Sequence, residues 1–321
     1  MRITLLGPQR RPRVDAVVRS LGLTGPFATV TAGWQEREAE DAELDALLGG
    51  RSVNLALYRR FGEVLAADPE YAAAVFRRRE VLAELAALYL LRLDLAVRAV
   101  HDIRRHDGSP GIRDAAEREA VQAIRDLDAG QLAAVGEVDA EFYAAFPPHE
   151  REPVAAHRAE IARLLSGCPA FVMAGGHVGV LAETLHLFNI AAMLHRAGPD
   201  LVVLAWSAGA MSLTERIVLF HDRSAHGPAV AEIHGPGLGL VPALVALPSA
   251  HRRLRMDDHG AMSVLARRFA PARCLVLEAG DRVDLAADGG LPAGAAVLGA
   301  DGRVQQPDPA GEQRTASCGA G

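Results

Sequence analysis

Short apolar runs alternate with amphipathic segments at both ends of this 321-residue chain, and helical patterning alone fills the stretch between them. Near the start, the runs Ile3–Leu6 and Phe27–Thr31 flank the helical spacing of Val14–Leu21. Such alternation predicts a βαβ unit, the building block of a mostly parallel sheet with helices on both faces. We therefore expect a three-layer α/β sandwich whose first part spans residues 1–34.

The middle of the chain, residues 35–166, has the apolar spacing of long amphipathic helices and no strand signal. Glycine pairs, prolines and a polar stretch separate the expected helices. These helices are Ala39–Leu48, Val53–Ala67, Pro69–Arg105, Ile112–Leu127 and Pro153–Leu165. Since the α/β pattern resumes afterwards, we expect an all-helical insertion, which could cap a site, form a homodimer interface or bind a protein partner.

The α/β pattern returns in residues 167–306, where a helix is expected over Val178–Arg196. The expected strands of this part are Ala170–Met173, Leu201–Ala205, Val241–Leu247, Cys274–Leu277, Arg282–Leu285, Ala295–Leu298 and Arg303–Gln305. The last two read as a hairpin. Residues 307–321 are expected to form a disordered tail.

The formal net charge of the chain is −6. Because nucleic-acid binding needs a concentrated positive face, this balance argues against nucleic acid as the main partner. No apolar stretch approaches the roughly 20 residues that span a bilayer, and the start of the chain lacks a secretory pattern, so we expect a cytoplasmic protein without a membrane partner. Three widely spaced cysteines, Cys168, Cys274 and Cys318, indicate neither a disulfide framework nor a metal site, and no cofactor is expected.

Ser207 stands between a continuous apolar strand and a helix, in the sequence Ala205-Trp206-Ser207-Ala208-Gly209. This is the setting of a nucleophile elbow, a sharp turn that needs small neighbours and lifts the serine hydroxyl above the sheet. The amide of Ala208, at the start of the helix, is placed to stabilise an oxyanion. Ser207 is therefore a candidate nucleophile for amide-bond chemistry.

A second glycine turn, Ala174-Gly175-Gly176-His177, follows the expected strand Ala170–Met173. If its strand neighbours that of Ser207 in a parallel sheet, the amide of Gly176 can supply a second oxyanion donor. The same placement brings Gly175 and His177 near a substrate. Trp34, Arg37 and Trp206 are further candidate substrate-binding residues.

A serine nucleophile needs a general base, and that base needs an acceptor to hold its tautomer. His251 follows the expected strand Val241–Leu247 and is our first candidate, with His221 and His259 as competitors. Glu278 ends the expected strand Cys274–Leu277 and could orient the imidazole.

The order of these motifs resembles the dipeptidase E and cyanophycinase family of serine peptidases, which share the class I glutamine amidotransferase-like fold. The similarity covers roughly residues 1–34 and 168–305. It rests on Ala174–His177, Trp206–Ala210, Gly237–His251 and Leu277–Gly280. The resemblance implies a small peptide or amide substrate, with an acidic character. It implies these roles: nucleophile Ser207, base His251, orienting acid Glu278, and oxyanion donors Gly176 and Ala208.

Three features depart from the family pattern. The first turn has two glycines and a histidine where the family has three glycines and an asparagine. Ser249 and Ala250 separate Pro248 from His251, so a strict register would put Ser249 at the position of the base. The helical insertion is the third departure. Three functions stay open: a serine hydrolase, an acyltransferase using the same acyl-enzyme, and a catalytically silent binding or regulatory protein.

Overall fold

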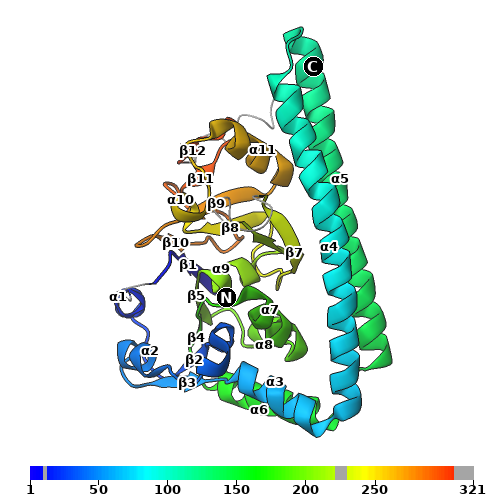
Figure 1. Ribbon diagram of the computed structural model, residues 1–321. Coiled ribbons are helices and arrows are strands. Elements are labelled where there is room, and N and C mark those ends of the chain that lie inside the picture. The colour runs from blue at the N-terminus through cyan, green and yellow to red at the C-terminus, as the bar shows by residue number, and fades with distance from the viewer. Residues whose placement is uncertain (10–12, 221–229, 307–321) are drawn as a thin grey trace, which may run out of the picture.

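The computed structural model describes residues 1–9, 13–220 and 230–306, and Figure 1 shows an α/β core with a long helical hairpin beside it. The expected tail, residues 307–321, and the competing base His221 both lie outside the described residues.

A six-stranded sheet forms the first half of the core, in the order β10-β1-β5-β4-β2-β3. Its strands are β1 (Arg2–Leu6), β2 (Phe27–Val30), β3 (Ser52–Asn54), β4 (Ala170–Met173), β5 (Val202–Trp206) and β10 (Arg282–Asp284). All neighbours are parallel except β10 and β1. Every residue of β2, β4 and β5 is buried, as expected of a parallel sheet covered on both faces. The expected α/β class with a mostly parallel sheet is confirmed.

The second half of the core has a sheet of its own, in the order β12-β11-β9-β8. Its strands are β8 (Leu244–Pro248), β9 (Arg273–Leu277), β11 (Val297–Leu298) and β12 (Val304–Gln305). The strands β6 (Arg216–Leu219) and β7 (Glu232–Pro236) form a separate antiparallel pair. The sequence predicted one sheet, but β10 pairs with the outer edge of β1, so β8 and β9 build a second sheet instead.

Short helices join the strands of the core. They are α1 (Val14–Ser20), the 3₁₀ helix η1 (Ala32–Arg37), α2 (Ala42–Leu47), α7 (Val178–Leu187), α8 (Ile190–Arg196), α9 (Ala208–Leu213), α10 (Ala250–Arg253) and α11 (His259–Phe269). The single helix expected over Val178–Arg196 is broken, because Asn189 takes a left-handed φ of 53°. No single helix of the described residues is long and apolar enough to cross a bilayer, and the bent pair α7 and α8 reaches that length and composition only together.

The remaining helices lie, like α2, within residues 35–166: α3 (Leu57–Ala67), α4 (Pro69–Arg105), α5 (Pro110–Ala145) and α6 (Glu152–Ser166). In Figure 1, α4 and α5 form an antiparallel hairpin that runs past the core. The bounds of α4 agree with the sequence, since the Asp68 side chain accepts a hydrogen bond from the Tyr71 amide and Pro69 occupies the first turn. Residues 35–166 are not all helical, however, because they include the strand β3, which pairs with β2.

A buried ion pair fastens the hairpin to the second half of the core. Arg268 of α11 donates two hydrogen bonds to the Asp128 carboxylate of α5, at 2.6 and 2.7 Å. The hydroxyl of Tyr89, on α4, donates to the same carboxylate at 2.8 Å and accepts from the Ile233 amide at 3.1 Å. Three helices and β7 therefore meet at one satisfied polar cluster.

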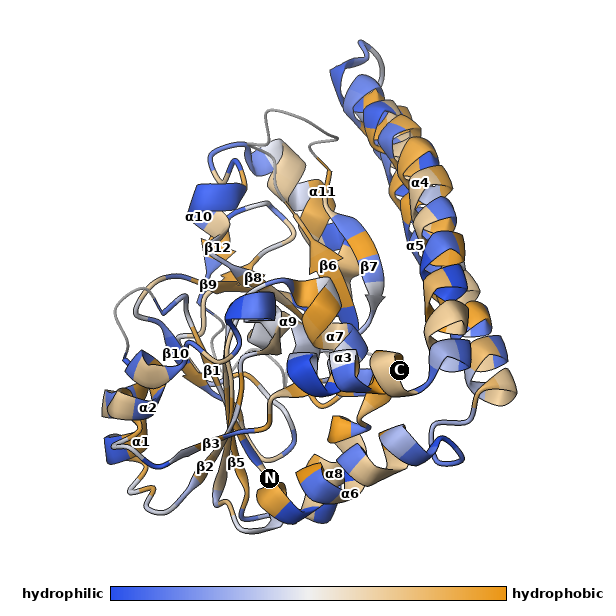
Figure 2. Cartoon of the chain, turned by 60° about the horizontal axis from the view of Figure 1, so that its bottom comes forward, coloured by the Kyte–Doolittle hydropathy of each residue, from blue (hydrophilic) through white to orange (hydrophobic). Residues whose placement is uncertain are grey.

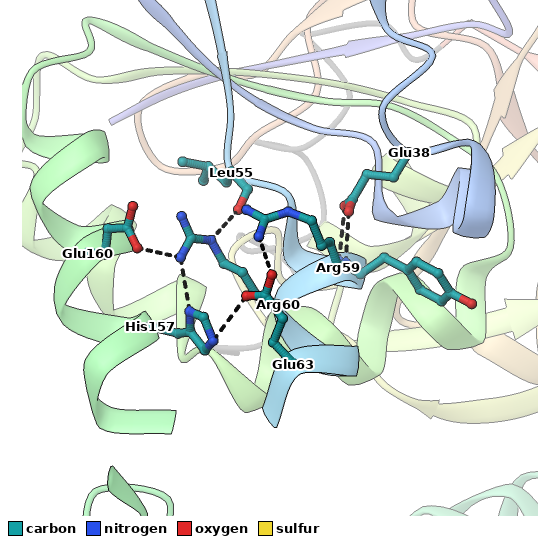
Figure 3. A network of polar contacts seen from close by, with 8 residues as sticks. Glu38, Leu55, Arg59, Arg60, Glu63, His157 and Glu160 are labelled. Carbon is teal, nitrogen blue, oxygen red and sulfur yellow. Dashed lines mark hydrogen bonds and ion pairs between the residues drawn. The ribbon is translucent and has the colours of Figure 1, made fainter. Parts of the chain in front are cut away.

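A second polar network, drawn in Figure 3, fastens α3 to α6. The buried guanidinium of Arg60 donates to the Leu55 carbonyl at 2.9 Å and to the Glu160 carboxylate at 2.6 Å, and it contacts His157 Nδ1 at 3.0 Å. The buried carboxylate of Glu38 accepts from two amides at the start of α3, those of Tyr58 and Arg59. Burial raises the pKa of Glu38 above its ordinary value.

Candidate active site

Ser207 lies on the sharp turn between β5 and α9. Its φ of 53° and ψ of −125° are unusual for a residue with a side chain, and such strain persists only where the surrounding structure holds it. The Ser207 carbonyl accepts a hydrogen bond from the Met211 amide at 3.1 Å, so the helix starts immediately after the turn. The backbone thus has the shape expected of a nucleophile elbow.

The glycine turn after β4 packs directly against this elbow. Strands β4 and β5 are parallel neighbours with Met173 opposite Ala205, so their carboxyl ends meet. A β-carbon added at Gly175 would lie 2.6 Å from Ser207 Cβ and 3.4 Å from the Ala208 amide nitrogen. Only glycine fits at that distance from the serine.

The end of β2 completes the floor of the site. The His177 amide donates to the Gly33 carbonyl at 2.7 Å. Gly176 has a φ of 135°, and a β-carbon there would lie 2.3 Å from the same carbonyl oxygen. Three neighbouring parallel strands therefore deliver their loops to one edge of the sheet, where open α/β folds place ligands.

Two backbone amides beside Ser207 have no acceptor among the residues that the structure describes. They belong to Ala208, at the first turn of α9, and to Gly176, in the turn after β4. The first amides of a helix lack partners within the helix and carry its positive dipole end. Such free donors are suited to a carbonyl oxygen that becomes negatively charged.

His251 and Glu278 meet at the ends of two further parallel strands, β8 and β9, where Pro248 lies opposite Leu277. The distance from His251 Nδ1 to Glu278 Oε1 is 2.9 Å, and the His251 amide donates to the same oxygen at 2.8 Å. This contact fixes the imidazole edge that faces the carboxylate and leaves Nε2 for another partner.

The described residues contain no hydrogen bond between Ser207 Oγ and an imidazole. After β8, Ser249 takes a left-handed φ of 57° and starts the single turn of α10. Helical spacing then turns Ser249, Arg252 and Arg253 toward the cavity beside Ser207, while His251 does not line it. The imidazole is 62% exposed, and neither it nor Glu278 lines the cavity.

The cavity in front of the elbow has a volume of about 630 Å³, within the usual range for small-molecule sites. The predicted site residues among its walls are Trp34, Arg37, Gly175, Gly176, Trp206, Ser207 and Ala208. His177 is not among them, because its Nδ1 accepts a hydrogen bond from the Val180 amide at the start of α7. His259 begins α11 beside Gly302 and does not line the cavity either.

Arg252 and Arg253 are wall residues that did not enter the sequence-based site. The sequence did contain an indication of their role, because the two arginines directly follow His251. The Arg253 guanidinium lies over the Phe220 ring at 5.8 Å, and burial lowers its pKa, although an arginine remains cationic in proteins. Arg37 also lines the cavity, but it is paired with Glu40 of the same wall at 2.7 Å, so Arg252 and Arg253 are the cationic groups closest in sequence to His251. In the described part of the chain, no group of three His, Cys, Asp or Glu side chains is arranged to hold a metal ion.

No protein-family profile matches the chain, and no curated protein sequence matches it. Among solved structures, the chain is similar to a "crystal structure of a peptidase from an acI-B1 Actinobacterium", with 11% sequence identity and a TM-score of 0.39. The match covers 93% of this chain and 87% of the other.

Proposed function

We propose that the protein is a serine hydrolase of peptide or isopeptide bonds, built on a class I glutamine amidotransferase-like core. The observation that supports this most directly is the strained turn at Ser207, which faces a cavity and has beside it two amides without an acceptor among the described residues. A strained residue with oxyanion donors at the end of a parallel strand is costly to maintain without chemistry.

In the proposed reaction, Ser207 Oγ attacks the substrate carbonyl carbon and its proton passes to Nε2 of His251. The carbonyl oxygen becomes negative and accepts hydrogen bonds from the amides of Ala208 and Gly176. The C–N bond then breaks, and the departing amine takes the proton from His251. Water, deprotonated by the same imidazole, resolves the ester and restores the serine.

Glu278 would hold His251 in the tautomer that this sequence needs, through the 2.9 Å contact to Nδ1. The proposed reaction requires Nε2 of this exposed imidazole to reach Ser207 Oγ when substrate is bound, while Nδ1 keeps its contact with Glu278. Contacts between nucleophile and base commonly tighten only when substrate is bound.

Two arginines favour an acidic substrate. Arg252 and Arg253 line the same cavity as Ser207, whereas Arg37 is paired with Glu40, and guanidinium groups bind carboxylates with paired hydrogen bonds. A carboxylate near the scissile bond would be held at this wall. This agrees with the substrate character implied by the sequence resemblance.

A catalytically silent binding protein is the second candidate. One observation favours it: His251 does not line the cavity and makes no hydrogen bond to Ser207. In that case the cavity would bind an acidic ligand and leave it intact.

Labelling with a fluorophosphonate, followed by intact-mass measurement, separates the two functions. The hydrolase predicts one adduct on the wild-type protein, none on Ser207→Ala, and labelling about 100-fold slower on His251→Ala. Ser249→Ala is the matched control, since Ser249 lines the same cavity and should leave labelling intact. An unlabelled wild-type protein, or equal rates with and without His251, would support the silent binding protein. Adding amines to a peptide substrate tests whether the acyl group is transferred instead of hydrolysed.

A further inference from the structure

An apolar stripe lies on the surface of α4, away from the active site. Its members are Val81, Leu88, Leu91 and Leu95, whose exposed fractions run from 45% to 66%. The spacings of seven, three and four residues put them on one face of the helix. In Figure 2, hydrophobic and hydrophilic residues alternate along α4 in the hairpin.

This stripe is separate from the face that packs inside the protein. The buried residues in the same part of α4 are Tyr89, Leu93 and Val100, which point to another side of the helix. A helix with two apolar faces packs with one partner on each of them, and the spacing of the exposed face is that of a coiled-coil seam. Contiguous exposed leucines of this kind mark an interaction surface.

Charged residues lie along the stripe in a definite order. Arg77, Glu84 and Arg92 form no ion pair with another described residue, whereas the neighbouring Arg78, Arg79 and Arg98 are paired. Asp102 pairs only with Arg105 of its own helix, and both side chains are more than 70% exposed. The stripe therefore begins with a positive charge at Arg77 and ends with a negative charge at Asp102.

We propose that the stripe binds the same stripe of a second copy of this chain, with the two α4 helices antiparallel. A two-fold axis between positions 89 and 90 places Leu88 opposite Leu91 of the second copy. The same register places Arg77 opposite Asp102 of the second copy. It places Glu84 opposite Leu95 of the second copy, within one helical turn of Arg92 of that copy. Arg77, Glu84 and Arg92, which are unpaired among the described residues, then each lie near an opposite charge.

The charge order selects this direction. A parallel, in-register pair would put Arg77 against Arg77, Glu84 against Glu84 and Asp102 against Asp102, and facing like charges are destabilising. With 37 residues at about 1.5 Å each, α4 is about 55 Å long, which is enough for a two-helix seam. Leu88 and Leu91 of the two copies supply the apolar contact at the centre of the seam, and the charges supply the orientation.

Sedimentation velocity on the full chain tests the interface. We expect a dimer for the wild-type protein and a monomer for the double variant Leu88→Glu and Leu95→Glu, with unchanged circular dichroism. Ile112→Glu is the matched control, because Ile112 is 75% exposed on α5 outside the stripe, and it should remain dimeric. A wild-type monomer at all concentrations, or a dimer that ignores the leucine changes, would overturn the proposal.

A charge exchange tests the antiparallel register. Arg77→Asp and Asp102→Arg should each weaken the dimer about five-fold, and the two changes together should restore it. Failure of the double variant to recover contradicts this register. Because Ser207 is remote in sequence and fold from the stripe, labelling of the serine reports on the proposed function separately from dimerisation.

Discussion

Gly175 packs against Ser207 so closely that a β-carbon at the glycine would lie 2.6 Å from the β-carbon of the serine. That contact joins the turn after β4 to the turn after β5, and it sets the distance between the amides of Gly176 and Ala208. The integrity of the proposed oxyanion site thus depends on a residue that has no side chain.

Gly175→Ala should abolish labelling of Ser207 by a fluorophosphonate, or slow it at least about ten-fold, because the added carbon forces the two turns apart. Overpacking of this kind costs about 1–3 kcal/mol of unfolding free energy. Gly130→Ala is the control, since a β-carbon at Gly130 in α5 meets nothing within 4 Å. That variant should label normally. Unchanged labelling of the Gly175 variant would show that the turn does not shape the site.

Glu278→Gln should lower turnover and serine labelling about 100-fold or more, with little effect on stability. The amide cannot stabilise the imidazolium that forms when His251 accepts a proton. Its NH₂ group is also a hydrogen-bond donor where the carboxylate of Glu278 accepts from His251. Glu43→Gln is the matched variant, because Glu43 lies at the same cavity without contacting His251. If both variants lose activity equally, the carboxylates act through the overall charge of the cavity and not through His251.

Local patterns explain how much of the fold could be predicted. The Asp68 cap and Pro69 fix the start of α4, and the polar residues from His106 end it, so sequence alone locates this helix. The strand β3 could not be predicted in this way, because Ser52–Asn54 is short and partly exposed and gains its conformation by pairing with β2. The division into two sheets likewise depends on which strand pairs with the outer edge of β1, and local sequence patterns do not specify that strand.

The sequence likewise predicts some contacts of the candidate site and not others. The contact between the turns at Gly175 and Ser207 follows from parallel neighbouring strands, which the alternation of elements predicts. The contact between His251 and Glu278 also follows from neighbouring strands. Whether His251 faces Ser207 depends instead on the rotation of a four-residue helix, α10, and on the left-handed Ser249 before it. No periodicity in the sequence reports such a rotation.

Arg268→Met should lower the unfolding free energy by about 3–5 kcal/mol, because it leaves the Asp128 carboxylate buried and uncompensated. Replacing both partners, with Arg268→Met and Asp128→Leu, should cost less than the single change. Tyr89→Phe should cost about 1–2 kcal/mol, since Asp128 and the Ile233 amide both lose a partner. Urea denaturation measures each value.

The exposed pair of Arg98 and Asp94 provides the comparison for that ion pair. Arg98→Ala should change the unfolding free energy by less than about 1 kcal/mol, because solvent screens charges at the surface. Equal losses at Arg268 and Arg98 would mean that the buried cluster does not hold the hairpin to α11.

The pH dependence of stability should contain a contribution from His157. Burial, and then the neighbouring Arg60 guanidinium, lower the pKa of this imidazole below 6.5. The unfolded chain therefore binds a proton at His157 more readily than the folded chain does, and stability falls as pH drops below about 6.5 toward the folded pKa. His157→Gln should reduce the loss of unfolding free energy between pH 7 and pH 5, measured by urea denaturation. His149→Gln, at a 76% exposed imidazole, should leave that loss unchanged. An identical loss in the His157 variant would show that other groups cause the loss of unfolding free energy at acidic pH.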